Sequence, residues 1–101
     1  MIRITLVCAA GMSTSMLMAK MQQSAKNKNI DVHIIAMPET KFETYKEPTD
    51  ILLIGPQISY MEDDLKEKYE PKGIKVKVID MVDYGSMNGE KVLTDALTLL
   101  N

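Results

Sequence analysis

The stretch Asp50-Ile51-Leu52-Leu53-Ile54 decides the fold, because it is a continuous apolar run with no polar residue alternating through it. Such a run is typical of a β-strand that is covered on both faces. Gly55-Pro56-Gln57 follows at once and predicts a turn at the carboxyl end of that strand. A strand covered on both faces favours a parallel sheet between two layers of helices.

The segments around this strand alternate between strand and helix patterns. Further strands are predicted over residues 2–7, 30–36 and 74–79. Pro38 is predicted to interrupt the chain just after the second of these strands. Helices are predicted over about 13–26, within 39–47 and from Ile58 to Tyr69. The first of them carries the apolar stripe Leu17, Met21 and Ala25, and a last helix is predicted around the stripe Val92, Ala96 and Leu100. Residues 80–89 are predicted to form an irregular loop.

This alternation forces parallel strands joined by right-handed crossovers. The fold class predicted is α/β: one flavodoxin-like domain over residues 1–101, with a four-stranded parallel sheet of order 2-1-3-4 and helices on both faces. In such a sheet the winding reverses between the first and third strands, and ligands bind outside the carboxyl ends of the strands at that point. The loops after Val7 and Ile54 should therefore open at one place.

The composition excludes several classes of protein. The chain has 101 residues, enough for one domain, and its net charge of −2 without a basic block argues against nucleic acid as a partner. A single cysteine rules out an internal disulfide, and the apolar runs are too short to span a membrane. No signal peptide precedes the first strand, so a cytoplasmic protein is expected.

The loop after the first strand carries the chemistry. Cys8, the only cysteine, ends the strand and is followed by Ala9, Ala10, Gly11, Met12, Ser13, Thr14 and Ser15. Backbone N–H groups of a loop before a helix N-terminus bind a dianion, and the positive potential there favours a thiolate and any phosphoryl group that it carries. The sequence thus predicts Cys8 as a nucleophile and residues 9–15 as a phosphate-binding loop. The alternative is an inert, buried Cys8 next to hydroxyls that only cap the helix.

Low-molecular-weight protein tyrosine phosphatases have a similar fold and place the pattern C-x5-R after the first strand. Here Thr14 stands six residues after Cys8, and the only arginine, Arg3, is at the far end of the strand. A guanidinium binds phosphate bidentately and stabilises the charge of the transition state. Without it, hydrolysis of a phosphocysteine should be slow, which suits a carrier better than a phosphatase.

The chain resembles the IIB subunits of the lactose/cellobiose (chitobiose) class of the bacterial phosphotransferase system (PTS). The resemblance covers nearly the whole chain and includes Cys8-x-x-Gly11-x-Ser13-Thr14-Ser15, Gly55-Pro56-Gln57, and Asp83-Tyr84-Gly85 through Met87, Gly89, Lys91, Val92 and Leu93. It implies that Cys8 accepts phosphate from a phosphohistidine of EIIA and passes it to a sugar held by the membrane transporter EIIC. It also implies that residues 9–15 hold the phosphate and that the protein associates with the inner face of the membrane through EIIC. The sugar, of cellobiose, chitobiose or lactose type, stays open.

No cofactor and no metal are expected, since the densest carboxylate run, Glu62-Asp63-Asp64, is explained as charge at a helix start. His33 is interpreted as a structural or edge-strand residue. Gln57 and Tyr84 are predicted to lie at the same rim as Cys8, either as turn and packing residues or as contacts of the phosphorylated loop or a partner.

Three hypotheses for the function remain at this point: a sugar-specific phosphocarrier, a small cysteine-dependent phosphatase, and a binding or redox module with an inert Cys8. A carrier should dock its partners around Cys8, through Met12, Gln57 and part of the segment 80–89. Asp80 and Asp83 in that segment are interpreted as loop-structuring or partner-facing rather than as a general acid.

Overall fold

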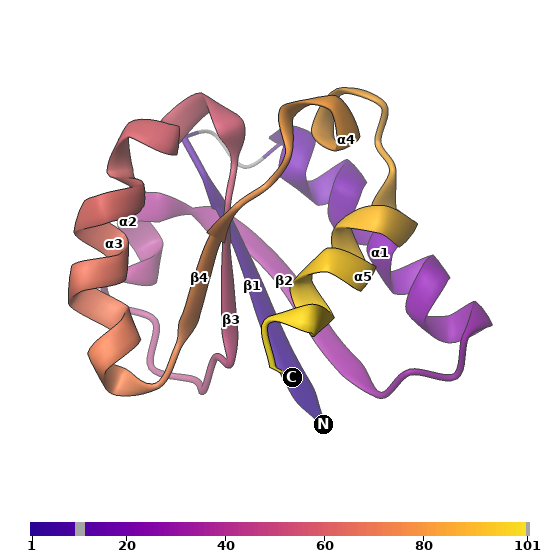
Figure 1. The fold of residues 1–101 in the computed structure, drawn as a ribbon, viewed down its shortest axis with the longest axis horizontal. Coiled ribbons are helices and arrows are strands. Elements are labelled where there is room, and N and C mark those ends of the chain that lie inside the picture. The colour runs from indigo at the N-terminus through magenta and orange to yellow at the C-terminus, as the bar shows by residue number, and fades with distance from the viewer. Residues whose placement is uncertain (10–11, 101) are drawn as a thin grey trace.

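A computed structural model of the chain describes residues 1–9 and 12–100, with all of their side chains except those of Met12 and Ser13. The strands are β1 (Ile2–Cys8), β2 (Val32–Pro38), β3 (Ile51–Ile54) and β4 (Lys75–Val78). The helices are α1 (Met12–Asn27), α2 (Glu39–Phe42), α3 (Glu62–Tyr69), α4 (Met81–Gly85) and α5 (Gly89–Thr98), with short 3-10 helices η1 (Pro56–Met61) and η2 (Glu70–Lys72). All strand pairs are parallel and the order is β2-β1-β3-β4, which confirms the predicted topology (Figure 1).

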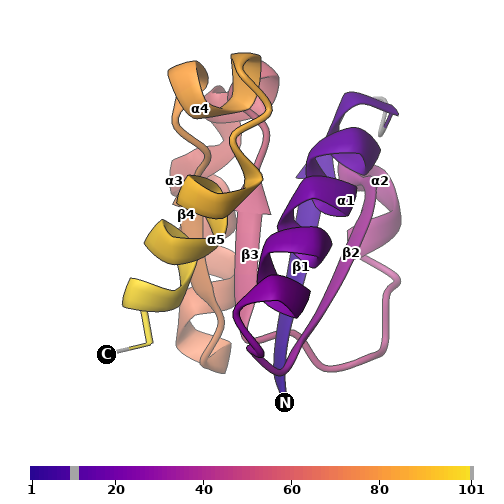
Figure 2. The ribbon, with the colours of Figure 1, turned by 90° about the vertical axis from the view of Figure 1, so that its right-hand side faces the viewer.

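The sheet lies between two helical layers. Helices α1 and α5 run side by side over one face, and α2 and α3 cover the other (Figure 2). Strand β3 serves both layers: Ile51 and Leu53 pack into the core beneath α1 and α5, and Leu52 and Ile54 into the core beneath α2 and α3. All four side chains are at most 1% exposed, so the apolar run of residues 51–54 is covered on both faces as predicted.

The helix stripes predicted from periodicity mostly face the core. Leu17, Met21 and Ala25 of α1 are buried, as are Val92 and Ala96 of α5. The assignment of Leu100 to the last stripe was wrong, because α5 ends at Thr98 and Leu100 is 41% exposed.

The second strand begins and ends two residues later than predicted. Pro38 does not interrupt it but closes it, paired opposite Cys8. Proline is tolerated there because β2 is an edge strand, and a residue on an edge need not donate a hydrogen bond to a second neighbour.

The predicted irregular loop over residues 80–89 contains the short helix α4, so that prediction was wrong in part. Asp80 is its N-cap: the carboxylate accepts hydrogen bonds from the N–H groups of Val82 at 2.7 Å and Asp83 at 3.4 Å. The first two residues of α4, Met81 and Val82, are exposed, so the helix shows no apolar stripe that periodicity could reveal.

Candidate functional site

The carboxyl ends of β1 and β3 meet where the sheet reverses its winding. Val7 pairs with Ile54, and the Gly55 N–H donates to the Val7 carbonyl at 2.8 Å, extending the pairing by one step. Cys8 follows Val7 as the last residue of β1, and η1 begins directly after Gly55. The loops after the first and third strands therefore open at one place, as predicted.

Cys8 and Thr14 are in direct contact at this place. The Cys8 Sγ lies 3.1 Å from the Thr14 Oγ1, and the two residues are only 4% and 0% exposed. The hydroxyl can accept from a thiol and, after rotation, donate to a thiolate. The sulfur thus has a neutral hydrogen-bonding partner that can serve either protonation state.

Cys8 also borders a cavity, although the residue is only 4% exposed. A cavity of about 210 Å³ between α2 and η1 is lined by Cys8, Ala9, Glu39, Thr40, Ile58, Tyr60 and Met61. A cysteine that lines a cavity at the end of a strand differs from one enclosed in a core. This geometry favours a functional Cys8 over an inert one.

The other residues of the predicted phosphate loop divide into two groups. Ala9 and Ser15 are exposed and Thr14 is buried. Ala10 and Gly11 lie outside the described residues, as do the side chains of Met12 and Ser13. Helix α1 begins at Met12 and is 16 residues long with no acidic residue in its first turn, so the positive end of its dipole follows Cys8 closely.

Arg3 lies at the opposite end of β1 from the thiol. Its backbone N–H donates to the Asp50 carboxylate at 2.8 Å, and it pairs with His33 of β2. His33 is exposed on that edge strand, five positions before the residue opposite Cys8. The interpretation of His33 as an edge-strand residue is confirmed, and neither residue stands near the sulfur in the register of the sheet.

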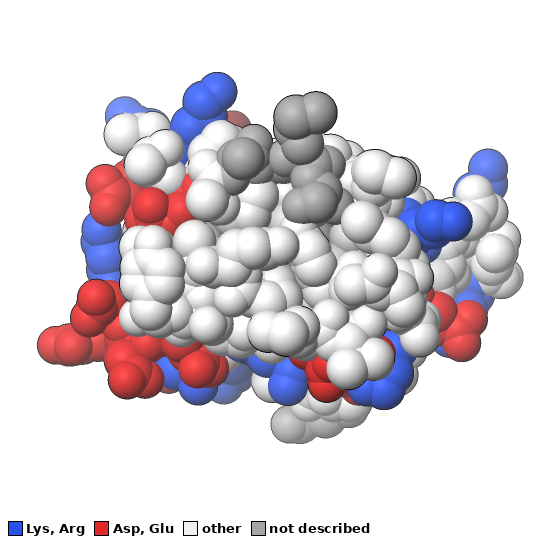
Figure 3. Space-filling model, turned by 90° about the horizontal axis from the view of Figure 1, so that it is seen from above, with Lys and Arg blue, Asp and Glu red and all other residues white. Residues whose placement is uncertain are grey.

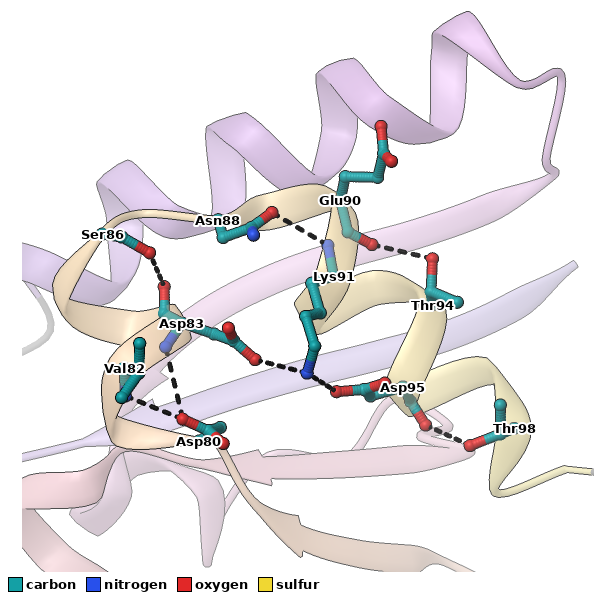
Figure 4. A network of polar contacts seen from close by, with 10 residues as sticks. All are labelled: Asp80, Val82, Asp83, Ser86, Asn88, Glu90, Lys91, Thr94, Asp95 and Thr98. Carbon is teal, nitrogen blue, oxygen red and sulfur yellow. Dashed lines mark hydrogen bonds and ion pairs between the residues drawn. The ribbon is translucent and has the colours of Figure 1, made fainter.

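An ion-pair network that the sequence analysis missed joins α4 to α5 (Figure 4). The Lys91 Nζ lies 3.0 Å from the buried Asp83 carboxylate and 3.0 Å from that of Asp95. Hydrogen bonds to Asp83 and, second, to Asp95 raise the pKa of Lys91 above its usual value of 10.5. Spacing could have indicated the pair of Lys91 with Asp95 four residues on, but no local pattern connects residues 83 and 91.

The contacts of α4 give three candidate residues a structural role. Asp80 and Asp83 are structural, since one caps α4 and the other holds it to α5. Tyr84 is buried in the core beneath α1 and α5, which supports its interpretation as a packing residue.

The end of the molecule that carries Cys8 is poor in charge. Seen from above, its central part is uncharged and the charged side chains lie at the rim (Figure 3). Met16, Tyr60, Met81 and Val82 are all more than 60% exposed, and each lies on a segment that follows the carboxyl end of a strand. Their elements place these exposed apolar side chains toward the end of the molecule at which Cys8 ends β1.

The described residues offer neither a metal site nor a membrane-spanning helix. Residues 1–9 and 12–100 hold no group of His, Cys, Asp or Glu side chains that could bind a metal ion. Across the same ranges, no helix combines the length and the apolar character that a membrane crossing requires.

The fold and the site define a class: parallel α/β proteins with a cysteine loop between the first strand and the first helix. Residues 3–95 match the family "PTS system, Lactose/Cellobiose specific IIB subunit". The chain is 42% identical over 103 residues to the PTS system cellobiose-specific EIIB component of Lactococcus lactis subsp. lactis (strain IL1403), covering 97% of this chain and 95% of the relative.

Two solved structures agree with this match. The solution structure of a cellobiose-specific phosphotransferase IIB component from Borrelia burgdorferi is 44% identical, with a TM-score of 0.78, covering 97% of this chain and 90% of that one. A lactose-specific IIB component domain from Streptococcus pneumoniae has a TM-score of 0.88 at 16% identity, covers 99% and 98% of the two chains, and supports the fold alone.

The chain belongs to the lactose/cellobiose-specific IIB family of the PTS. It is thus a sugar-specific EIIB component, and EIIB components are phosphotransferases. Family membership implies EIIA and EIIC partners.

Proposed function

We propose that Cys8 is the phosphoryl carrier of this EIIB component. It accepts a phosphoryl group from a phosphohistidine of EIIA and transfers it to a cellobiose-, chitobiose- or lactose-type sugar bound by EIIC. The observation that carries the proposal is the position of Cys8: its sulfur lies 3.1 Å from the Thr14 hydroxyl of α1, and the residue borders the cavity between α2 and η1.

The two transfers are in-line displacements at phosphorus. In the first, the Cys8 thiolate forms the S–P bond while the P–N bond breaks. The electron pair of the P–N bond stays on the histidine nitrogen, which then takes up a proton from water. In the second, a sugar hydroxyl oxygen forms the O–P bond while the S–P bond breaks and the electron pair returns to sulfur. The hydroxyl proton passes to a base of EIIC or to water. In such transfers the protein mainly supplies positioning and charge stabilisation.

Backbone N–H groups of residues 9–15 and the N-terminal end of α1 are proposed to hold the phosphoryl oxygens. The Thr14 hydroxyl is proposed to donate to the sulfur when the thiolate forms and again when it leaves the phosphorus. No guanidinium is available, because the only arginine of the chain lies at the far end of β1. This favours a carrier over a cysteine-dependent phosphatase, since the charge of the transition state for water attack is less well stabilised.

The uncharged face around Cys8 is proposed to receive EIIA and EIIC in turn. A site that serves two partners alternately needs modest, transient contacts, which exposed Met16, Tyr60, Met81 and Val82 can supply by re-packing. Docking to EIIC would bring the protein to the inner face of the cell membrane.

The proposal is tested by supplying labelled phosphoenolpyruvate, the upstream phosphotransfer proteins and EIIA. We expect one phosphoryl group on the wild-type protein, mapped to Cys8, and no label on Cys8→Ser. Label on another residue, or none on either protein, would refute the proposal. Rapid turnover of an aryl phosphate by the wild-type protein alone would point to the phosphatase instead.

A further inference from the structure

We propose that the side-chain amide of Gln57 binds the phosphoryl group on Cys8. The inference rests on the proposed carrier function and adds to it a donor from outside the loop of residues 9–15. It assigns a role to a residue whose sequence context, Gly55-Pro56-Gln57, also fits an ordinary turn.

The geometry around Gly55 brings the amide close to the thiol. A Cβ placed on Gly55 would lie 3.1 Å from the Gln57 Oε1 and 3.2 Å from the Cys8 Cβ. The Gln57 amide oxygen and the Cys8 Cβ therefore lie on either side of the position that a side chain on Gly55 would occupy, and the glycine lets them approach each other. Although Gln57 as a residue is exposed, its carboxamide folds back toward the end of β1.

The backbone that carries Gln57 is held on both sides. Pro56 fixes the first turn of η1, and Ile58 is buried, its N–H donating to the Gly55 carbonyl at 3.0 Å. A donor presented by a fixed backbone loses little freedom when its ligand arrives. The amide is thus positioned before any phosphoryl group is present.

The hydrogen-bonding capacity of this amide is unused within residues 1–9 and 12–100. In the part of the chain that the structure describes, no hydrogen bond engages the Gln57 carboxamide. A carboxamide offers two N–H donors, and its oxygen and nitrogen exchange places by a half turn of the terminal bond. After that turn, an N–H group faces the space next to Cys8.

The chemistry explains why a neutral donor is suitable here. The amide approaches from the loop after β3, whereas the backbone N–H groups of residues 9–15 belong to the loop after β1. It adds charge stabilisation to the transfer without the full positive charge of a guanidinium, which would also favour attack by water. A carrier needs fast transfer to a docked partner and slow loss to solvent, and one neutral donor satisfies both.

The direct test is NMR of the side-chain N–H₂ signals of the wild-type protein before and after phosphorylation by EIIA. We expect the Gln57 signals to shift and to be protected from exchange with water. Gln23 is the matched control, since it is exposed on α1 and already donates to Asn27 at 3.1 Å. Its signals should stay in place.

Variants separate a phosphoryl contact from a packing role. Gln57→Met keeps the length and the apolar stem but removes the donors, and we expect single-turnover phosphorylation of Cys8 to slow by about 10- to 100-fold, the usual loss for one hydrogen bond to a charged group. Gln57→Glu, which adds a negative charge, should slow it further, and Gln23→Met should not change it. If Gln57 only packs against Gly55, Gln57→Met transfers at the wild-type rate.

The outcomes distinguish this inference from the proposed function. A wild-type protein that takes no phosphate on Cys8 overturns both. A wild-type protein that is phosphorylated on Cys8, with unshifted Gln57 signals and a Gln57→Met variant of normal rate, overturns the inference alone.

Discussion

The contact between α5 and α1 makes Gly89→Ala the most informative stability test. Gly89 is buried at the first residue of α5. A Cβ there would lie 2.6 Å from the carbonyl carbon of Lys20, 2.6 Å from its Cβ and 2.6 Å from the backbone nitrogen of Met21. Two of these atoms belong to the backbone of α1, so no side-chain rotation can relieve the overlap.

The expected loss of stability follows from this geometry. Non-bonded carbon atoms need about 3.5–4.0 Å, so α5 must retreat from α1 by about 1 Å. The retreat loosens the packing of Leu93 and Ala96, which are 1% and 0% exposed. Overpacking a core costs about 1–3 kcal/mol, and a backbone overlap belongs at the upper end of that range. For a chain of this size about 2–3 kcal/mol corresponds to a fall in Tm of roughly 10 °C or more.

The assay is urea and thermal unfolding followed by circular dichroism. Gly85→Ala is the matched control, because a Cβ on Gly85 would meet nothing within 4 Å. We expect the control to equal the wild-type protein or to exceed it by up to about 1 kcal/mol, the helix-propensity gain of alanine over glycine. A Gly89→Ala protein with the wild-type unfolding midpoint would refute the close contact of α1 and α5.

Three further predictions concern the thiol, the ion pair and the core. Thr14→Val removes the hydroxyl that lies 3.1 Å from the Cys8 sulfur and keeps the shape of the side chain nearly constant. It should slow single-turnover phosphorylation at least about tenfold, whereas Thr14→Ser should transfer normally. Equal rates for Thr14→Val and the wild-type protein would contradict the role of the hydroxyl. Because pairing with Asp83 raises the pKa of Lys91 above 10.5, its contribution to stability is complete below pH 10.5 and is lost as the pH rises through the raised value. Unfolding of wild type and Lys91→Met should therefore differ by a constant free energy near neutral pH, and a difference that persists unchanged in strong alkali would argue against the pairing. Leu53→Ala should cost about 2–5 kcal/mol in urea unfolding, and a loss well below that range would mean that β3 is not covered on the face beneath α1 and α5.

The fold was predictable because its determinants are local. The apolar run over residues 51–54 indicates burial on both faces, and alternating strand and helix patterns leave few topologies. The sequence analysis placed Cys8 and Thr14 in one loop but did not predict their contact, although its cause is local as well: a strand, a short loop and a helix N-terminus bring residues six apart together.

Other features depend on distances that no local pattern encodes. Helix α4 has no buried stripe at its start, and only Asp80 as a capping residue with Asp83 three residues later could have indicated it. The ion pair of Asp83 with Lys91 joins two helices, and so it requires their packing to be known.

The site shows the same division between local and tertiary information. That Gly55 leaves room between Gln57 and Cys8 follows from the pairing of β1 with β3 and from the course of η1. A glycine before a proline in a sequence indicates a turn, but it does not reveal which side chains lie on either side of it.

The central claim is that Cys8 retains a phosphoryl group until a partner takes it. It is tested most directly by following the ³¹P signal of the isolated phosphorylated protein, first alone and then after adding membranes that contain EIIC and a candidate sugar. We predict a thiophosphate signal that persists in buffer and is replaced by that of a sugar phosphate only when both EIIC and its sugar are present. Rapid release of inorganic phosphate by the protein alone would contradict the account.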